Sequence, residues 1–188
     1  MLTYRSEDGR FLESARVLLG NNGLRALGRS VRAPDDGPAF TASYRLFVND
    51  EGVLARLSVT SATVERERNL TLNHTEDGYW LLDTGSGGSR AEFAGAMDVD
   101  LAFSPVFNAL PIRRLGLHRE PGDHVVPMVF VSLPTLEVRL VEQTYATVRP
   151  VGSDGRGVVR FGSGEFTREL PVDADGLVLD YPGLATRL

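Results

Sequence analysis

Strict alternation of apolar and polar side chains is the feature that most limits how this chain can fold. Between positions 40 and 48, every second residue is apolar, and Thr41, Ser43 and Arg45 stand between them. The same period of two recurs over 97–103 and over 136–140. Because successive side chains of a β-strand point to opposite faces of a sheet, each run is predicted to be a strand with one buried face. In the last run, the residues predicted to be buried are Leu136, Val138 and Leu140.

Asp-Gly and Asn-Gly pairs separate the alternating runs. They occur at positions 8–9, 22–23, 36–37, 77–78, 154–155 and 175–176. Asp and Asn tolerate a positive φ and Gly favours one, so these pairs suit tight hairpin turns. The pattern predicts a mainly β fold built from an antiparallel meander, as a barrel, a sandwich or a rolled sheet. No repeat and no long linker divides the chain, so residues 1–188 are expected to form one domain.

The segment 104–116 departs from the alternation and is predicted to contain a short helix. Ser104 or Asn108 could cap it. Because a helix tolerates proline only in its first turn, Pro111 places the expected start of the regular helix near Asn108. Gly116 is the expected end.

The balance of charge argues against two classes of partner. The chain has 20 basic and 25 acidic residues, scattered along its length, and a net charge of −5. A nucleic-acid-binding protein usually carries a basic stripe or tail, and basic segments are also what an anionic membrane surface attracts, so neither partner is expected.

The residue types that are missing exclude several kinds of chemistry. All basic residues are Arg, and Cys does not occur. This rules out a phosphate-loop lysine, a Schiff-base lysine, a thiol nucleophile and a thiolate metal site. The first residues lack the pattern of a signal peptide, and no run approaches the roughly 18 apolar residues of a membrane span. The expected location is the cytoplasm, and the protein is not expected to be an integral membrane protein.

The segment from Asp98 to Leu115 reads DVDLAFSPVFNALPIRRL. It resembles the signature of the putative glycolipid-binding family, in which Asp-Val-Asp-Leu is followed by Ser/Thr-Pro, by Asn and by Leu-Pro-Ile-Arg-Arg-Leu. Gln143 with Tyr145, the ending 176–184 and a leucine-rich segment at 12–27 extend the resemblance over nearly the whole chain. Tyr4 stands where the family would have Trp, a departure that affects a packing detail.

The resemblance implies a long antiparallel sheet rolled around a single short α-helix, called a spiral β-roll, and a homodimer. The fold is similar to that of lipoprotein-carrier proteins, and a curved sheet closed on one helix can leave an apolar slot for an acyl chain. The implied partner is a lipid or glycolipid, with no cofactor and no catalysis. The expected ligand-binding residues are Asp98, Asp100, Asn108, Arg113, Arg114, Leu110, Ile112, Leu115, Tyr145 and Tyr181.

Asp98 and Asp100 are two positions apart on a predicted strand, so their carboxylates share one face. Two like charges this close raise each other's pKa or attract a cation. Three interpretations of the two carboxylates are open: a metal pair, a clamp on a polar headgroup, and an ion-pair network with Arg113 and Arg114. The network is preferred because Arg pairs bidentately with carboxylates. The apolar residues of the helix are interpreted first as core, although a lipid slot would use the same residue types.

Two motifs suggest enzyme chemistry. Asp83-Thr84-Gly85-Ser86 matches the Asp-Thr-Gly of aspartic proteases, but that chemistry needs two carboxylates and the chain has one copy. The glycines that follow predict instead a hairpin loop between strands 79–83 and 90–95. His118 and His124 are interpreted as part of a solvent loop rather than as a metal pair. The alternatives to lipid binding are a scaffold without a ligand, or a dimeric aspartic-protease-like or metal-dependent hydrolase.

Overall fold

The computed structural model describes residues 1–85 and 87–188. Over these ranges the chain is mainly β, with two sheets and one α-helix, so the prediction of a mainly β fold rolled around a short helix is confirmed. The first sheet contains β1 (Leu2–Arg5), β2 (Phe11–Leu19), β3 (Leu24–Arg32), β4 (Phe40–Val48), β5 (Leu54–Ala62), β6 (Glu67–His74), β7 (Trp80–Asp83), β8 (Gly88–Ala91), β14 (Asp180–Tyr181) and β15 (Ala185–Arg187).

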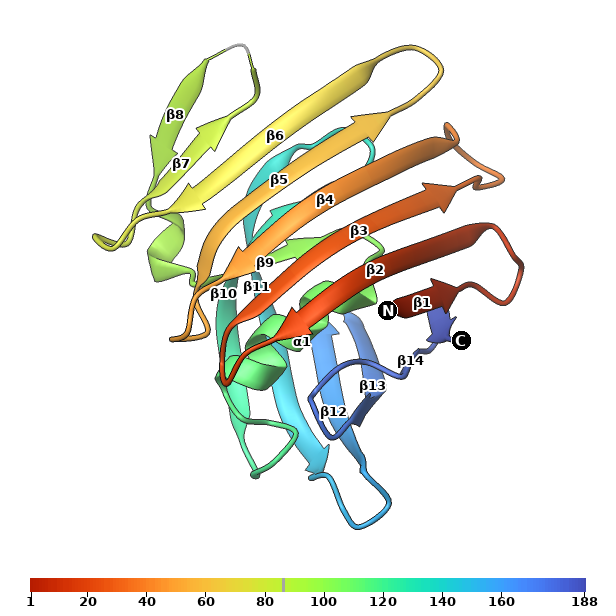
Figure 1. Ribbon diagram of the computed structural model, residues 1–188, viewed down its shortest axis with the longest axis vertical. Helices are drawn as coiled ribbons and strands as arrows, with labels where there is room; N and C mark the ends of the chain where they lie inside the picture. The colour runs from red at the N-terminus through yellow and green to blue at the C-terminus, as the bar shows by residue number, and fades with distance from the viewer. Residues whose placement is uncertain (86) are drawn as a thin grey trace.

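The first sheet is an antiparallel meander that runs across the front of Figure 1. Its strand order is β14-β15-β1-β2-β3-β4-β5-β6-β7-β8. All the predicted Asp-Gly and Asn-Gly pairs lie in connections between strands, and Gly9 and Gly78 have positive φ values of 72° and 81°. β15 pairs with β1, which places the two ends of the chain side by side.

The second sheet contains β9 (Asp98–Leu101), β10 (Asp123–Val131), β11 (Val138–Arg149), β12 (Arg156–Ser163) and β13 (Phe166–Asp173). Its order is β13-β12-β11-β10-β9, and β9 runs parallel to β10. The prediction of an antiparallel arrangement is therefore wrong for this one pair. Parallel neighbours need a long crossover, and here the crossover contains the helix α1 (Pro105–Arg114), whereas the short 3-10 turn η1 (Phe93–Gly95) precedes β9.

α1 begins at Pro105 rather than near Asn108, so the predicted start is wrong. Pro105 occupies the first turn, where proline is well tolerated, and Pro111 lies inside the helix. The predicted end is confirmed. Gly116 has a φ of 68°, its N–H donates to the Arg113 carbonyl, and the N–H of Leu117 donates to the Ile112 carbonyl, which together form a Schellman motif. Within the described residues, no helix is long and apolar enough to span a membrane.

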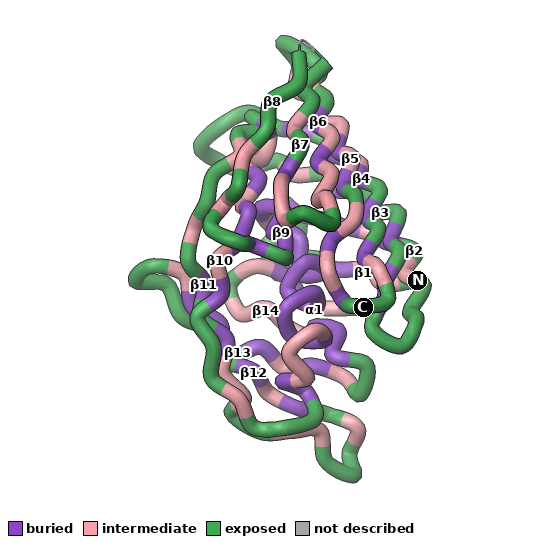
Figure 2. Tube along the Cα trace, turned by 90° about the vertical axis from the view of Figure 1, so that its left-hand side faces the viewer, coloured by how far each residue is buried: buried purple, intermediate pink, exposed green. Residues whose placement is uncertain are grey.

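α1 lies between the two sheets, where Figure 2 shows it buried. One apolar cluster fills the space between α1 and the first sheet, and a second cluster lies between α1 and the second sheet. Tyr4, which replaces the Trp expected from the family, is fully buried, and its hydroxyl donates to the Val178 carbonyl at 2.8 Å. Tyr4 is therefore a packing residue of the core that also forms one buried hydrogen bond.

Two predicted burial patterns are wrong. All of β9 is buried, not one face, because the first sheet covers Val99 and Leu101 while α1 and β11 cover the opposite face. Leu140 on β11 is exposed although Leu136 is buried. Leu140 pairs with Val129, which packs in the cluster against the first sheet, so it stands on the predicted face but beyond the part of β11 that this cluster covers.

Candidate functional site

A cleft of about 450 Å³ opens beside the first turn of α1. Its wall comes from β9 and α1 on one side and from β10–β13 and the C-terminal segment on the other. The side chains that line it are Arg32, Asp100, Leu101, Ala102, Phe103, Ser104, Asn108, Phe130, Gln143, Phe161, Ser163, Phe166, Arg168, Tyr181, Pro182 and Leu184, with Gly183. Of the sequence-predicted ligand residues, Asp100, Asn108 and Tyr181 are in this set.

The floor of the cleft is a continuous chain of hydrogen bonds. Gln143 Nε2 donates to Asp100 Oδ2 at 2.7 Å, and Tyr145 OH donates to Gln143 Oε1 at 3.0 Å. Asn108 Nδ2 donates to Tyr145 OH at 3.1 Å. The chain joins β9, β11 and α1, and it positions the carboxyl and amide groups that face the cleft. Tyr145 itself is fully buried behind them.

The carboxyl group of Asp100 titrates close to neutrality. Burial raises the pKa of Asp100 to about 6, against a smaller lowering by the hydrogen bond from Gln143. Asp100 has no cationic partner among its hydrogen bonds. Around neutral pH the cleft therefore presents a carboxylate able to accept further hydrogen bonds, and at mildly acidic pH it presents a neutral acid.

Aromatic rings form the other wall. Phe161 lies 6.0 Å from Tyr181 and 6.2 Å from Phe166, measured between ring centroids. Two arginines lie on rings that line the cleft: the Arg32 guanidinium is 3.8 Å from the centre of the Phe103 ring, and that of Arg168 is 4.4 Å from the centre of the Phe166 ring. The cleft thus combines hydrogen-bonding groups, an apolar wall and two cationic groups.

The predicted ion-pair network forms only in part. Arg114 holds Asp98 bidentately, with Nη2 at 2.5 Å and Nε at 3.0 Å from Oδ2, and Asp98 is fully buried. Arg113 does not reach either aspartate. Its guanidinium donates to the backbone carbonyls of Gly20 at 3.1 Å and Asp175 at 2.6 Å. The two aspartates therefore have different roles. Asp98 links β9 to the C-terminal end of α1 through its ion pair with Arg114, and Asp100 faces the cleft.

The apolar residues predicted from the helix lie away from the cleft. Leu110 packs in the cluster against the first sheet, Ile112 packs in the cluster against the second sheet, and Leu115 packs at the edge of that second cluster. None of the three lines the cleft.

Most of the aromatic wall, and Gln143, were not among the ligand-binding residues predicted from the sequence. Gln143 and Tyr145 alternate on one face of β11, a signal present in the sequence. The ring pair Phe161 and Phe166 comes from a hairpin whose position over β9 depends on strand pairing, and no local pattern identifies it.

A buried carboxyl group behind the cleft was also missed. Glu13 Oε1 accepts hydrogen bonds from Tyr44 OH at 2.7 Å and from Ser104 Oγ at 2.5 Å, while Glu13 Oε2 is buried without a hydrogen-bond partner. Burial raises the pKa of Glu13 to about 7, and these two hydrogen bonds lower it by less. Ser104 also lines the cleft, so this residue connects the cleft wall to the core.

The two enzyme-like motifs lie elsewhere. Asp83 is exposed at the end of β7, and its Oδ1 accepts a hydrogen bond from the backbone N–H of Gly85 at 2.7 Å. The predicted hairpin forms, but its second strand is β8 (Gly88–Ala91) and not 90–95, because the chain enters η1 at Phe93; Ser86 lies outside the described residues.

His118 lies in the turn that follows α1, as predicted, but not in solvent, and His124 lies in β10 rather than in a loop. His118 is buried, with its Nδ1 3.4 Å from the Ile112 carbonyl, because the chain after α1 folds back under the helix. His124 is exposed at the start of β10. Over residues 1–85 and 87–188, no group of three or more His, Cys, Asp or Glu side chains could hold a metal ion.

Comparison with known proteins bears on the whole chain. A family described as "Putative glycolipid-binding" matches residues 1–187. The crystal structure of a DUF1089 family protein from Pseudomonas aeruginosa superposes with a TM-score of 0.75 at 28% sequence identity, covering 98% of this chain and 95% of that one. A β-barrel-like protein of domain of unknown function DUF1849 from Brucella abortus has a TM-score of 0.51 at 9% identity, covering 99% and 92%, which is a likeness of fold alone. Curated proteins give no match.

Proposed function

Because the chain belongs to the putative glycolipid-binding family, we propose that it binds a glycolipid-like amphiphile in the cleft beside the first turn of α1. The sugar hydroxyls would hydrogen-bond to Asp100, Asn108 and Gln143, and the apolar part would lie against the aromatic wall. The observation that supports this proposal most directly is that one cleft combines carboxyl and amide groups on its floor with aromatic rings on its wall.

The size and composition of the cleft support an amphiphile over a purely apolar ligand. Its volume of about 450 Å³ lies within the range usual for small-molecule sites. A fatty acyl chain alone would leave the Asp100 carboxylate buried without new partners, and a buried unpaired polar group is unfavourable. A hydroxylated headgroup supplies those partners.

The proposed position differs from a slot running along the helix. The spaces between α1 and both sheets are filled by the two apolar clusters. The ligand would therefore enter beside the start of α1 and leave Leu110 and Ile112 in the core. Binding without a chemical step, a cytoplasmic location and a homodimer are parts of the same proposal.

The first experiment is native mass spectrometry of the purified protein, followed by solvent extraction and lipid analysis. A stoichiometric adduct that extracts as a sugar-bearing acyl species is the expected result. Titration with octyl glucoside below its micelle concentration, with glucose and with octanoate then separates the contributions of headgroup and chain. Octyl glucoside is expected to bind best. A clean mass with no shift on adding any of these probes would overturn the proposal.

Two variants test the cleft directly. Asp100→Asn removes a charge-assisted acceptor and is expected to weaken octyl glucoside binding about tenfold, since such hydrogen bonds contribute roughly 1.5–3 kcal/mol. Phe166→Ala shortens the aromatic wall and is expected to weaken binding by a smaller factor. Phe47→Ala is the matched control, because Phe47 and Phe166 are exposed to 39% and 40% but Phe47 lies on the far face of the first sheet.

The pH dependence of binding follows from Asp100. Its pKa of about 6 means that wild-type affinity should fall as pH is lowered through that value, as the carboxylate acceptor is lost. Asp100→Asn should show no such fall. Isothermal titration calorimetry on either side of pH 6 measures the difference, and equal pH profiles for the two proteins would remove Asp100 from the site.

A further inference from the structure

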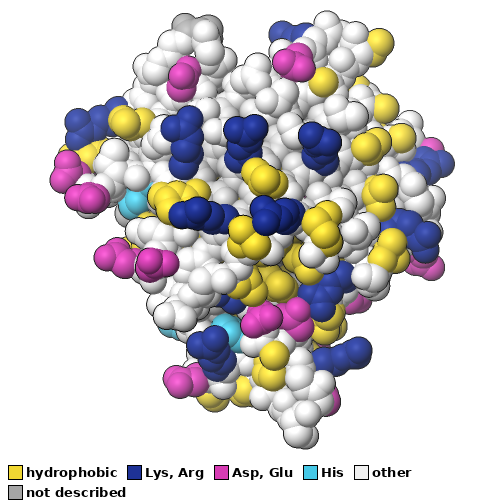
Figure 3. Space-filling model, viewed as in Figure 1, with side chains coloured by type: hydrophobic (Ala, Val, Ile, Leu, Met, Phe, Trp, Pro, Cys, Tyr) yellow, Lys and Arg dark blue, Asp and Glu magenta, His cyan; other side chains and the backbone are white. Residues whose placement is uncertain are grey.

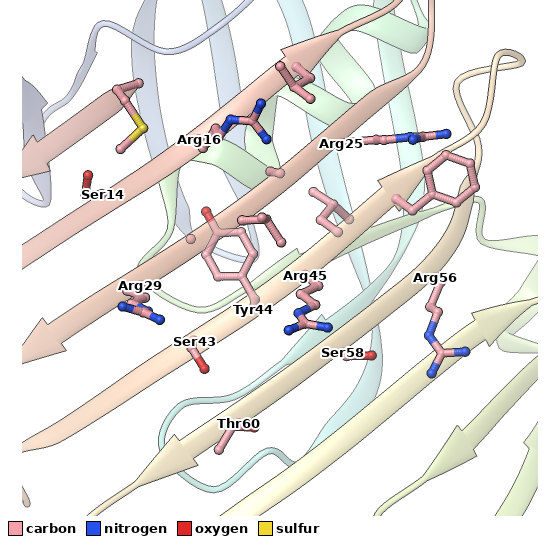
Figure 4. A pocket seen from close by; sticks show the side chains of 17 residues that line it. Ser14, Arg16, Arg25, Arg29, Ser43, Tyr44, Arg45, Arg56, Ser58 and Thr60 are labelled. Atoms are coloured by element: carbon pink, nitrogen blue, oxygen red, sulfur yellow. The ribbon is translucent and has the colours of Figure 1, made fainter.

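The outward face of the first sheet gathers arginines that are far apart in the sequence. Strand pairing aligns its side chains in three neighbouring rows that cross β2–β6, which we call the basic face. The rows are Leu18, Arg25, Phe47, Arg56, Asn73; Arg16, Leu27, Arg45, Ser58, Thr71; and Ser14, Arg29, Ser43, Thr60, Asn69. Figure 4 shows the five arginines on neighbouring strands, with serine and threonine hydroxyls beside them on the same face.

The basic face carries positive charge only. All of its positions are described by the structure, and none of them is Asp or Glu. The ion pairs found among the described residues use other arginines. A protein with a net charge of −5 therefore separates its charges in space, and Figure 3 shows dark-blue side chains across the middle of the molecule, with the acidic side chains above, below and beside them.

Apolar side chains lie between these arginines. Leu18, Leu27 and Phe47 are exposed to 48%, 50% and 39%, and each is a direct cross-strand neighbour of Arg25 or Arg45. The guanidinium of Arg25 lies 4.8 Å from the centre of the Phe47 ring. The next row adds exposed Leu12 and Val31, and it ends in exposed Glu67 on β6, which marks the edge of the basic face. Exposed apolar side chains that gather in one area of a surface are typical of an interaction site.

We propose that the basic face docks on an anionic lipid surface. Five arginines would lie at the level of the headgroup phosphates, and the leucines and Phe47 would enter the boundary between headgroups and acyl chains. The face is broad, and a hollow of about 1270 Å³ extends along it over β2–β5. A membrane presents phosphate and hydrocarbon together everywhere, so this mixture of Arg, Leu and Phe needs no matched pattern in a partner.

Two other occupants fit the same face less well. A symmetric dimer formed through it would set five arginines against the same five, with no carboxylate in the rows to pair with them. Nucleic acid would pair the arginines with phosphates, but it would also cover Leu18, Leu27 and Phe47 with charged backbone. This inference does not rest on the cleft, which lies on the other side of the first sheet.

The test is co-sedimentation of the full chain with vesicles. Vesicles of phosphatidylcholine are compared with vesicles in which about one third of the lipid is phosphatidylglycerol. The protein is expected to bind only the anionic vesicles, and binding should weaken as salt screens the charges. Arg29→Gln combined with Arg45→Gln should weaken partitioning roughly 25-fold, about fivefold for each arginine.

Matched control variants distinguish an effect of the basic face from an effect of the net charge of the protein. Arg119→Gln combined with Arg156→Gln changes the net charge equally, uses exposed arginines outside the basic face, and is expected to leave binding unchanged. Phe47→Ala should also weaken vesicle binding, whereas Phe166→Ala should not.

Three results would overturn the proposal. The first is that the protein binds anionic vesicles no better than neutral ones. The second is that both double variants lose the same amount of vesicle binding. The third is that polyglutamate or duplex DNA binds through the same arginines while the protein does not bind the vesicles. The cleft variants are tested for binding of soluble octyl glucoside, and the basic-face variants are tested for binding of vesicles. Either proposal can therefore fail without affecting the other.

Discussion

Gly28 on β3 lies directly opposite Tyr44 on β4, and the ring of Tyr44 occupies the space that a β-carbon at position 28 would need. The tyrosine leans across the neighbouring strand in this way to bring its hydroxyl to Glu13 on β2. A glycine inside a strand often marks such a close approach. The absence of a side chain at one position thus permits a hydrogen bond two strands away.

Gly28→Ala is expected to destabilise the protein by about 1–3 kcal/mol, because the new methyl group displaces a fully packed ring. Urea unfolding monitored by circular dichroism measures the change in free energy. Gly88→Ala is the control, since its β-carbon would make only an ordinary contact with the Leu82 carbonyl, and its effect should stay within about 0.5 kcal/mol. Equal stabilities for the two variants would show that Tyr44 moves aside freely.

Single residues also show where prediction from the sequence ends. The motif around Asp98 and Asp100 contributes Asp100 and Asn108 to the cleft, because these residues and the helix that follows are contiguous in the chain. Their different roles could not be predicted, since Arg114 and Gln143 reach them from separate elements. Phe161 and Phe166 were missed for the same reason: alternation gives the face of a strand but not which strand lies opposite.

At the scale of elements, α1 is held at its C-terminal end by charge. Arg114 pairs with buried Asp98 on β9, and Arg113 donates to carbonyls of the β2–β3 turn and of the segment after β13. The sequence predicted a short helix here but placed its start too late, because Pro111 was interpreted as a first-turn residue. Burial of nearly the whole helix between two sheets compensates for the hydrogen bond that Pro111 cannot make.

Arg114→Met should be strongly destabilising, by about 3–5 kcal/mol, because it leaves the Asp98 carboxylate buried without a cation. The double variant Asp98→Asn with Arg114→Met should recover part of this loss, since no charge is then buried. Arg149→Met breaks the exposed ion pair with Asp154 and should change stability by less than about 1 kcal/mol. Thermal unfolding of the three proteins ranks them, and a double variant less stable than Arg114→Met would contradict this role for the pair.

At the scale of the whole molecule, composition and topology lead to different expectations about charge. The scattered charges predicted no attraction to an anionic surface, yet antiparallel pairing of β2–β6 aligns five arginines on one side. Such an arrangement depends on register, which alternation and turn residues leave undetermined until each strand's partner is known. The rolled, mainly β fold itself was predictable because it follows from turns and periodicity that recur along the whole chain.

Glu13 connects the first sheet to α1, and its titration should be visible in the stability of the whole protein. The carboxyl group lies between Tyr44 on β4 and Ser104 at the start of α1, with its pKa raised from 4.5 to about 7 by burial. A raised carboxyl pKa means that the folded state holds the proton more tightly than the unfolded state. The stabilisation is therefore complete below about pH 4.5 and is lost as pH rises through about 7, a change of roughly 3 kcal/mol at 1.36 kcal/mol per pKa unit.

Glu13→Gln keeps the shape of the side chain and removes the titration. Urea unfolding from about pH 4.5 to about pH 8 should show the variant gaining stability over the wild type as pH rises, by up to about 3 kcal/mol. Comparing the two proteins at each pH cancels the contributions of Asp100 and His118. Glu7→Gln, at an exposed position in the turn after β1, should follow the wild type throughout. Parallel pH profiles for wild type and Glu13→Gln would mean that Glu13 stays ionised in the fold, so that Tyr44 and Ser104 alone stabilise a buried charge between the sheet and the helix.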